Sequence, residues 1–146
     1  SGQLLHRVIP RTFLSIINNQ KIPLHGGGRA MKSYIHATDL AKAIHIVIKK
    51  GKDGEIYNVG PKSPTSIKEV VTRVGKLYNL NLNQIAKVTE DRLGQDSIYW
   101  LNSLKINKLG WKQEINWDDG LQEVKMWVEK YKETLKKLSP DYIMRG

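Results

Sequence analysis

The sequence contains no cysteine, no internal repeat, no low-complexity stretch and no long apolar run. Without cysteine there can be no disulfide framework, no thiolate metal site and no cysteine nucleophile. No stretch is long and apolar enough to predict a membrane span. The first residues, Ser1 to Gln3, do not resemble the charged start of a signal peptide. We therefore expect a cytoplasmic protein without a membrane partner.

Several motifs of catalysis and cofactor binding are also absent. There is no G-x-x-x-x-G-K-[ST] phosphate loop, no G-x-G-x-x-G dinucleotide turn, no G-x-S-x-G elbow and no H-E-x-x-H metal motif. No tyrosine is followed by a lysine four positions later, and the 4 histidines are scattered. The residues alone therefore predict no catalytic residue, no metal ligand and no cofactor-binding residue.

The composition is that of one soluble globular domain. The chain has 146 residues, of which 40% are hydrophobic, and this length is enough for a buried core. Lysine and arginine number 24 against 14 acidic residues, so the net charge is +10. Such a balance predicts affinity for polyanions, but it does not choose among nucleic acids, phosphate esters and acidic lipids.

Helical and extended segments alternate along the chain, which predicts an α/β fold with few short strands and about five helices. The expected helices cover 10–19, 39–50, 66–78 and 103–109, and a last one starts near 116 and keeps one apolar spacing as far as Leu138. The expected extended segments cover 33–37, 55–59 and 85–89. Only two or three strands are few for an independent sheet.

Two of these segments carry more specific expectations. In the helix at 39–50, the apolar positions expected to face inward are Leu40, Ala41, Ile44, Val47 and Ile48. Residues 20–31 are expected to form a loop, in which the three glycines at 26–28 make a turn.

Polar residues beside expected turns are the candidates for ligand binding. Lys32 follows the glycine run, Asn58 ends an expected strand and Arg92 begins a loop. A cation at the end of an element is a natural ligand of an anion, and an arginine fork fits a pyrophosphate. Taken alone, a residue of this kind is more often a surface residue or part of a structural ion pair than a ligand contact.

Six motifs in order resemble the nucleotide-sugar epimerase/dehydratase family of the extended short-chain dehydrogenases, and within it the dTDP-glucose 4,6-dehydratases. The D-R-x-G-x-D string favours the dehydratases over the epimerases. The six motifs are R-V-I-P at 7–10, K-I-P-L-H-G at 21–26, K-S-Y-I-H-A-T-D at 32–39, G-E-I-Y-N-V-G at 54–60, D-R-L-G-Q-D at 91–96 and K-I-N-K-L-G-W at 105–111.

The resemblance implies a substrate-binding role for residues of these motifs. The position of Arg92 grips the diphosphate in the family, and the position of Lys32 is an arginine that does similar work. The position of His25 is an aromatic residue that packs on the base. The remaining family positions that border the nucleotide correspond to Arg7, Val8, Pro23 and Asn58.

The resemblance also implies a division of the chain. Residues 1–146 would form one substrate-binding unit, corresponding to the C-terminal half of the family. Segments of 1–60 would pack on a Rossmann sheet that this chain lacks, and 61–146 would form a helical lobe. The intact enzyme would bind NAD, but we expect neither NAD binding nor catalysis from this chain alone, because the glycine turn and the Tyr-x-x-x-Lys pair are absent.

Three functions remain open from the sequence. The first is the nucleotide-sugar-binding part of an NAD-dependent 4,6-dehydratase, a lyase of carbohydrate biosynthesis. The second is a non-catalytic module that binds nucleotide sugars, or that assembles as a homo-oligomer or with a Rossmann partner through an exposed apolar face. The third is nucleic-acid binding, which rests on the charge alone and which we do not expect, because no aromatic-basic motif supports it.

Overall fold

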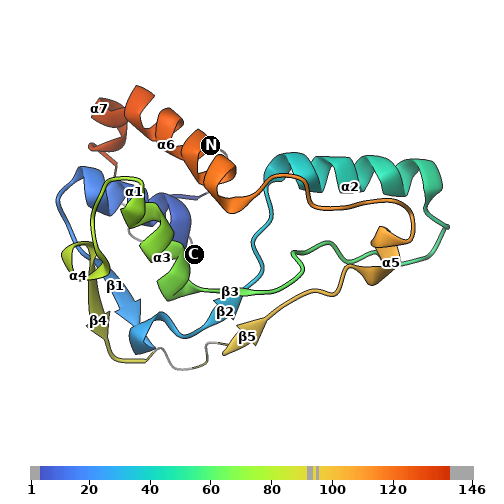
Figure 1. The fold of residues 1–146 in the computed structure, drawn as a ribbon, viewed down its shortest axis with the longest axis horizontal. Coiled ribbons are helices and arrows are strands. Elements are labelled where there is room, and N and C mark those ends of the chain that lie inside the picture. Colours follow the sequence, from blue (N-terminus) through green and yellow to red (C-terminus); the bar gives the residue numbers. More distant parts are fainter. Residues whose placement is uncertain (1–3, 92–93, 95, 139–146) are drawn as a thin grey trace, which may run out of the picture.

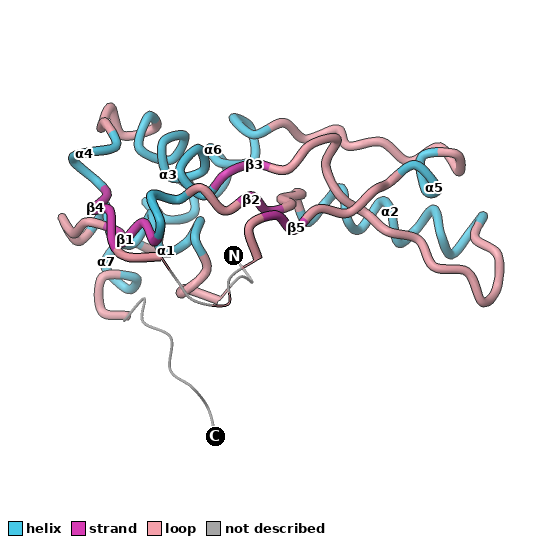
Figure 2. Tube along the Cα trace, turned by 90° about the horizontal axis from the view of Figure 1, so that it is seen from below, coloured by secondary structure: helices cyan, strands magenta, loops and turns pink. Residues whose placement is uncertain are grey.

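The computed structural model describes residues 4–91, 94 and 96–138. In this part of the chain, seven α-helices and five short strands form a body and an arm (Figure 1). The body holds most helices and strands, and the arm, residues 37–62 and 100–116, extends away from it with two helices (Figures 1 and 2). The predicted α/β class is confirmed, with two more helices than the sequence predicts.

Four helices of the body share one core. They are α1 (Val8–Ile17), α3 (Ile67–Lys76), α6 (Trp117–Lys130) and α7 (Lys132–Leu135). Each contributes apolar side chains on one face, and the buried members of the cluster are Phe13, Leu14, Ile17, Val74, Leu121, Val128 and Leu135. Burial of this stripe, rather than helix propensity, is what stabilises such short helices.

Side-chain caps fix where two of these helices begin. The Ser66 hydroxyl accepts a hydrogen bond from the Glu69 main-chain nitrogen at the start of α3, at 3.1 Å. At the start of α6, the side-chain oxygen of Asn116 accepts a hydrogen bond from the Asp119 main-chain nitrogen, at 2.9 Å. Each cap satisfies one of the amide groups that a helix N-terminus leaves without a partner.

A parallel strand pair lies beside this core. Strand β1 (Ile22–His25) pairs with β4 (Ala86–Thr89), which directly follows the short helix α4 (Leu82–Ile85). The buried side chains Ile22, Leu24, Val71 and Ile85 form a second cluster. The alternation of buried and less buried residues along β1 leaves His25 exposed at its end.

A second small sheet joins the body to the arm. Its central strand is β2 (Met31–Lys32), which pairs antiparallel with β3 (Thr65–Ser66) and parallel with β5 (Ile98–Tyr99). The 3₁₀ turn η1 (Gly26–Gly28) connects β1 to β2. All three glycines have positive φ, so the predicted turn is confirmed.

The arm has its own cluster. It carries α2 (Ala37–Lys50) and α5 (Leu104–Asn107), and its buried side chains are Ala43, Ile106 and Trp111. The Ser103 hydroxyl lies 2.7 Å from the nitrogen and 2.8 Å from the carbonyl oxygen of Gly60, which ties the 55–60 segment to the start of α5.

Four expectations about elements are wrong. The segment 20–31 contains β1 and the first residue of β2, and the sequence does not predict β1 because its parallel partner at 86–89 is distant in sequence. Residues 55–59 form no strand and pair with no described strand. The last helix breaks at Tyr131, whose φ of −109° and ψ of 19° are not helical. Leu40, Ile44 and Ile48 are 42%, 54% and 78% exposed, so this stripe of α2 faces outward.

Candidate functional site

The glycine turn η1 brings two distant segments together. His25 Nδ1, at the end of β1, lies 3.2 Å from the Glu90 carbonyl oxygen and 3.1 Å from Thr89 Oγ1. A carbonyl oxygen only accepts hydrogen bonds, so the contact with Glu90 calls for the proton on Nδ1 and leaves Nε2 as the acceptor of the neutral ring. The exposed ring is thereby fixed at the edge of the turn.

Gly26 lets the side chain of Asp91 approach this turn closely. A Cβ at Gly26 would lie 2.3 Å from Asp91 Oδ1, and the φ of Gly26 is +56°. Only glycine combines this conformation with this approach. Arg29, just after the turn, donates to Asp91 Oδ2 at 3.3 Å.

Lys32, in β2, contacts the other end of the D-R-L-G-Q-D string, at Asp96. Its Nζ donates to the main-chain carbonyl of Asp96 at 3.1 Å and lies 3.9 Å from that residue's carboxylate. The ammonium also stands 6.0 Å from the centre of the Tyr99 ring. The Lys32 side chain is 25% exposed, whereas that of Arg29 is 80% exposed, so Lys32 is the better fixed of the two cations.

The D-R-L-G-Q-D string is therefore held at both ends. Asp91 contacts Arg29, and Asp96 contacts Lys32. Arg92, the residue expected to grip a diphosphate, lies outside the described residues, as do Leu93 and Gln95. The acidic residues at the two ends of the string, Asp91 and Asp96, thus each lie beside a cation.

Sequence analysis did not single out a cluster of two aromatic rings and a cation that forms at Tyr34, just after β2. The rings of Tyr34 and Trp117 are 5.4 Å apart, and the Arg73 guanidinium stands 5.7 Å from the Trp117 ring. Arg73 also contacts Glu69 and Asp118. Burial raises the pKa of Tyr34 to about 12, so its phenol stays protonated at neutral pH.

The other predicted site residues are spread over α1, β1 and the arm. Arg7 is the exposed N-cap of α1, and Val8 begins that helix and packs against the cluster of β1. Pro23 lies in β1 opposite Lys87. Asn58 lies in the arm, exposed, in the segment whose neighbour Val59 packs on the arm cluster. The structure thus gathers Pro23, His25 and Lys32 around the glycine turn, and places Asn58 elsewhere.

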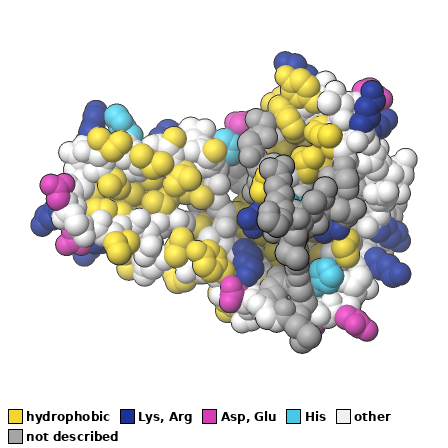
Figure 3. Space-filling view, turned by 180° about the vertical axis from the view of Figure 1, so that it is seen from behind, with side chains coloured by type: hydrophobic (Ala, Val, Ile, Leu, Met, Phe, Trp, Pro, Cys, Tyr) yellow, Lys and Arg dark blue, Asp and Glu magenta, His cyan; other side chains and the backbone are white. Residues whose placement is uncertain are grey.

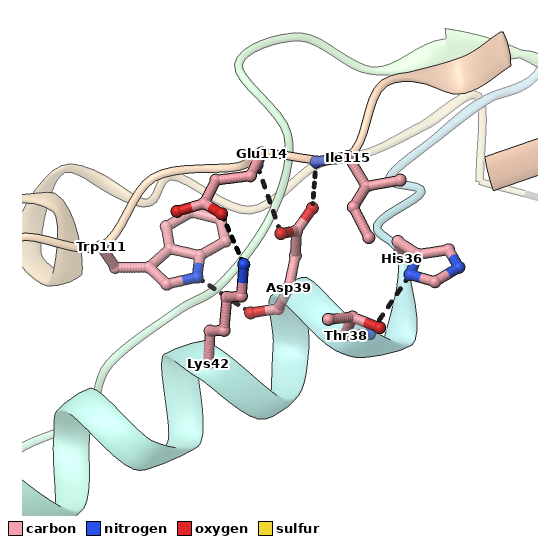
Figure 4. A network of polar contacts seen from close by, with 7 residues as sticks. All are labelled: His36, Thr38, Asp39, Lys42, Trp111, Glu114 and Ile115. Atoms are coloured by element: carbon pink, nitrogen blue, oxygen red, sulfur yellow. Dashed lines mark hydrogen bonds and ion pairs between the residues drawn. The ribbon is translucent and has the colours of Figure 1, made fainter. Parts of the chain in front are cut away.

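A polar network of the described residues lies in the arm and is structural (Figure 4). The buried Asp39 carboxylate accepts hydrogen bonds from the main-chain nitrogens of Glu114, at 3.2 Å, and Ile115, at 3.0 Å. Lys42 pairs with the Glu114 side chain, which lowers the pKa of Glu114 and raises that of Lys42. These contacts hold α2 against the 111–115 segment.

Cavities and clusters give no second candidate around the turn. An open cavity of about 690 Å³ lies in the arm, where Trp100, Asn102 and Lys112 are among its lining residues, and none of the predicted site residues lines it. Among the described residues, no group of histidine, aspartate and glutamate side chains is placed to hold a metal ion. Within the same residues, no helix is long and apolar enough to cross a membrane.

Comparison with known proteins defines the class of protein. The sequence profile of the NAD dependent epimerase/dehydratase family matches residues 1–60. A crystal structure of dTDP-glucose 4,6-dehydratase from Bacillus anthracis, in complex with NAD, superposes with a TM-score of 0.80 and 31% identity. The match covers 90% of this chain and 41% of that one. The chain is therefore related in sequence and in fold to the NAD-dependent epimerase/dehydratase family, which confirms the resemblance of its motifs.

Curated relatives point to particular enzymes of that family. The chain is 32% identical, over 126 residues, to a trifunctional UDP-glucose 4,6-dehydratase/UDP-4-keto-6-deoxy-D-glucose 3,5-epimerase/UDP-4-keto-L-rhamnose-reductase of Arabidopsis thaliana. It is 30% identical, over 130 residues, to dTDP-D-glucose 4,6-dehydratase of Homo sapiens. Each match covers 86% of this chain, but only 19% of the first relative and 37% of the second. The chain thus spans well under half the length of these relatives.

Proposed function

We propose that this chain binds the nucleoside diphosphate of a nucleotide sugar, as the substrate-binding part of an NAD-dependent 4,6-dehydratase. The observation that carries the proposal is the position of Lys32, a half-buried cation beside the glycine turn that also contacts the D-R-L-G-Q-D string. A cation fixed in this way loses little side-chain entropy when it meets a phosphate.

The other residues of the site have distinct proposed roles. Arg92 supplies a second cation for the diphosphate, and a guanidinium binds phosphate oxygens in a bidentate manner. His25 offers a flat ring at the edge of the turn, beside Pro23, on which a base can stack. Arg7, Val8 and Asn58 are proposed to border the nucleotide.

The proposed reaction needs residues that this sequence does not contain. The dehydratase reaction oxidises the sugar at C4, eliminates water across C5–C6 and returns the hydride. NAD supplies the hydride chemistry when it is bound, and the Tyr-x-x-x-Lys pair that would deprotonate the sugar is absent from this sequence. We therefore propose a chain that binds substrate in the cytoplasm and is not catalytic alone, with 1–60 facing a Rossmann part and 61–146 forming the helical lobe.

Isothermal titration with dTDP tests the binding proposal. The Lys32→Ala variant is expected to bind dTDP about 10- to 100-fold more weakly than the unaltered chain, because one charge-assisted hydrogen bond contributes about 1.5–3 kcal/mol. Lys49→Ala, an exposed lysine of α2, is the matched control and is expected to keep the affinity. No heat at millimolar dTDP, or equal affinities of all three proteins, would refute the proposal.

A second candidate function is a non-catalytic module that assembles with a partner chain. The exposed apolar stripe of α2 favours it, since monomeric soluble proteins rarely leave large apolar patches uncovered.

A further inference from the structure

The open cavity in the arm contains none of the residues proposed to bind a nucleotide. Its volume is about 690 Å³, and small-molecule sites typically measure roughly 300–1,000 Å³. Residues of three segments line it, from 60–62, 100–107 and 111–116. The first two segments run side by side, and the third leads from α5 back to α6 (Figure 1). The cavity is therefore a candidate for a ligand site of its own.

Hydrogen bonds between the first two segments fix the wall of this cavity. Ser103 is bonded to both main-chain polar atoms of Gly60, and the indole nitrogen of Trp100 donates to the Pro61 carbonyl at 2.9 Å. A Cβ at Gly60 would lie 2.9 Å from the Leu101 carbonyl oxygen, so the glycine permits this close approach. A wall that is already in place lowers the entropic cost of binding a ligand.

Trp100 supplies the cavity with an aromatic surface. The residue is 44% exposed, and its N–H group is already bonded to Pro61, which leaves mainly the two ring faces for a ligand. No ring and no cation of the described residues stacks on it. The face of an indole is electron-rich and attracts polarised C–H groups and flat rings.

Two amide side chains of the wall each keep one unused group. The Asn102 oxygen accepts from the Leu104 nitrogen at 2.8 Å, and its NH₂ group has no partner among the described residues. Gln113 shows the opposite case, because its NH₂ group donates to the Ile115 carbonyl at 3.1 Å and its oxygen has no partner there. A hydroxyl group can accept from the first amide and donate to the second, so this pair fits a ligand rich in hydroxyls.

Two lysines give the cavity a positive charge. Lys62 and Lys112 line it, and neither forms an ion pair with a described acidic side chain. Glu114 is the acidic residue of the lining, and Lys42 pairs with it. The pKa of Glu114 is lowered mainly by Lys42 and to a smaller extent by Lys112. The ammonium groups of Lys62 and Lys112 therefore favour an anion, and lysine is a common ligand of phosphate.

The cavity is distinct from the apolar surface of the arm. Figure 3 shows hydrophobic side chains gathered over one face of the arm. The exposed residues Leu40, Ile44 and Ile48 of α2 line no part of the cavity. A chain that covered the apolar stripe of α2 would leave the described lining of the cavity untouched.

We propose that the arm cavity is a second ligand site and that it binds a sugar phosphate. The sugar ring stacks on Trp100, and its hydroxyl groups bond to Asn102 and Gln113. The phosphate meets Lys62 and Lys112. A nucleoside monophosphate contains the same chemistry in its ribose phosphate, so the test has one arm for each source. The inference goes beyond the proposed function and does not require that the chain bind dTDP.

Isothermal titration of the 146-residue chain with glucose 1-phosphate tests the site. Glucose 1-phosphate is expected to bind at least about tenfold more tightly than glucose or inorganic phosphate, because each of these offers only part of the contacts. Uridine monophosphate is the second arm. Tighter binding of uridine monophosphate than of glucose 1-phosphate would identify a nucleotide as the source of the sugar phosphate, and weaker binding would identify a free sugar phosphate.

The double variant Lys62→Ala/Lys112→Ala is expected to weaken the binding of glucose 1-phosphate by at least about tenfold, because it removes two charge-assisted hydrogen bonds. Both lysines are exposed, so the variant is expected to keep its circular dichroism spectrum. Lys108→Ala is the matched control, because Lys108 is an exposed lysine of the arm that does not line the cavity. It is expected to keep the affinity.

A second pair of variants isolates the aromatic ring. Trp100→Leu and Trp100→Phe both lose the hydrogen bond to Pro61, but only Trp100→Phe keeps a ring on which a sugar can stack. Trp100→Phe is expected to bind glucose 1-phosphate at least about threefold more tightly than Trp100→Leu. Equal affinities of these two variants would show that no ring stacks at this position, and they would overturn the inference.

Four other results would also overturn it. They are no heat with either organic phosphate at millimolar concentration, inorganic phosphate binding as tightly as glucose 1-phosphate, an affinity that Lys62→Ala/Lys112→Ala does not change, and loss of binding in Lys32→Ala. The last result would assign glucose 1-phosphate to the proposed nucleotide site. Lys32→Ala is expected to keep the affinity for glucose 1-phosphate, and the double variant is expected to keep that for dTDP, so the two proposals fail independently.

Discussion

The indole nitrogen of Trp111 donates a hydrogen bond of 2.9 Å to the main-chain carbonyl of Asp39, although the two residues are 72 positions apart. Both residues are buried. The carboxylate of Asp39 in turn accepts from the main chain of Glu114 and Ile115 (Figure 4). Two residues, Asp39 and Trp111, therefore fasten α2 to the segment that leads into α6.

Asp39→Asn is expected to lower the free energy of unfolding by about 2 kcal/mol. The amide offers one acceptor oxygen where the carboxylate uses two, and its NH₂ group would face a main-chain N–H inside a buried site. Urea denaturation followed by circular dichroism measures the change. Asp53→Asn, at an exposed position in the turn after α2, is the control and should change stability by less than about 0.5 kcal/mol. Equal effects of the two substitutions would contradict this account of the network.

The glycine turn supplies a matched pair of substitutions. The Cβ added by Gly27→Ala would have no atom within 4 Å. The substitution therefore lowers the free energy of unfolding only through the strain of a φ of +69°, by about 1 kcal/mol. Gly28→Ala has a similar φ of +71° and in addition places its Cβ 2.8 Å from the Lys68 nitrogen. We expect Gly28→Ala to be clearly the more destabilising in thermal unfolding. If the two variants unfold alike, the turn does not pack on α3 as described.

Stability is expected to fall at alkaline pH through Tyr34. Burial raises its pKa from 10.0 to about 12, so between these values the native state keeps a proton that the unfolded state loses. The free energy of unfolding contributed by this group is complete below pH 10 and declines as pH rises towards 12. Tyr34→Phe should make the decline shallower in urea denaturation over this range. Tyr99→Phe, at a side chain 52% exposed, controls for loss of a phenol. A decline equally steep in all three proteins would contradict this assignment.

Lys32→Arg is expected to increase affinity for dTDP by about 3- to 10-fold. The guanidinium of an arginine at this position can donate two hydrogen bonds to a phosphate group at once, whereas the lysine ammonium acts as a single point charge. The substitution therefore adds about one hydrogen bond to the complex. Titration calorimetry measures the affinity, and Lys68→Arg on the exposed face of α3 is the control. Weaker binding by Lys32→Arg would indicate that the site is shaped around the ammonium.

The sequence predicts well those elements whose signals are local. The helices at α2, α3 and α5 and the strand at 86–89 follow from apolar periodicity, capping residues and closing glycines, and the structure confirms them. The family resemblance follows in the same way, because short motifs in a fixed order identify it without any knowledge of contacts.

Long-range contacts explain what the sequence does not predict. Strand β1 is stabilised by a partner more than sixty positions away, so no neighbouring residue marks it as a strand. The segment 55–59 has strand-forming residues between two glycines, but these residues alone do not provide a neighbouring strand for its main chain. At the candidate site, the motifs indicate His25 and Lys32, whereas the contact between the Tyr34 and Trp117 rings depends on how α6 returns to the loop before α2.

The parallel pairing of Ile22–His25 with Ala86–Thr89 limits how the chain can be shortened. A polypeptide that stops before Ala86 leaves β1 as a lone strand and removes the carbonyl of Glu90 from beside His25. During synthesis the glycine turn therefore gains its final neighbours only after α3 and α4 have emerged, and any shorter version intended to retain the site has to extend past Asp96.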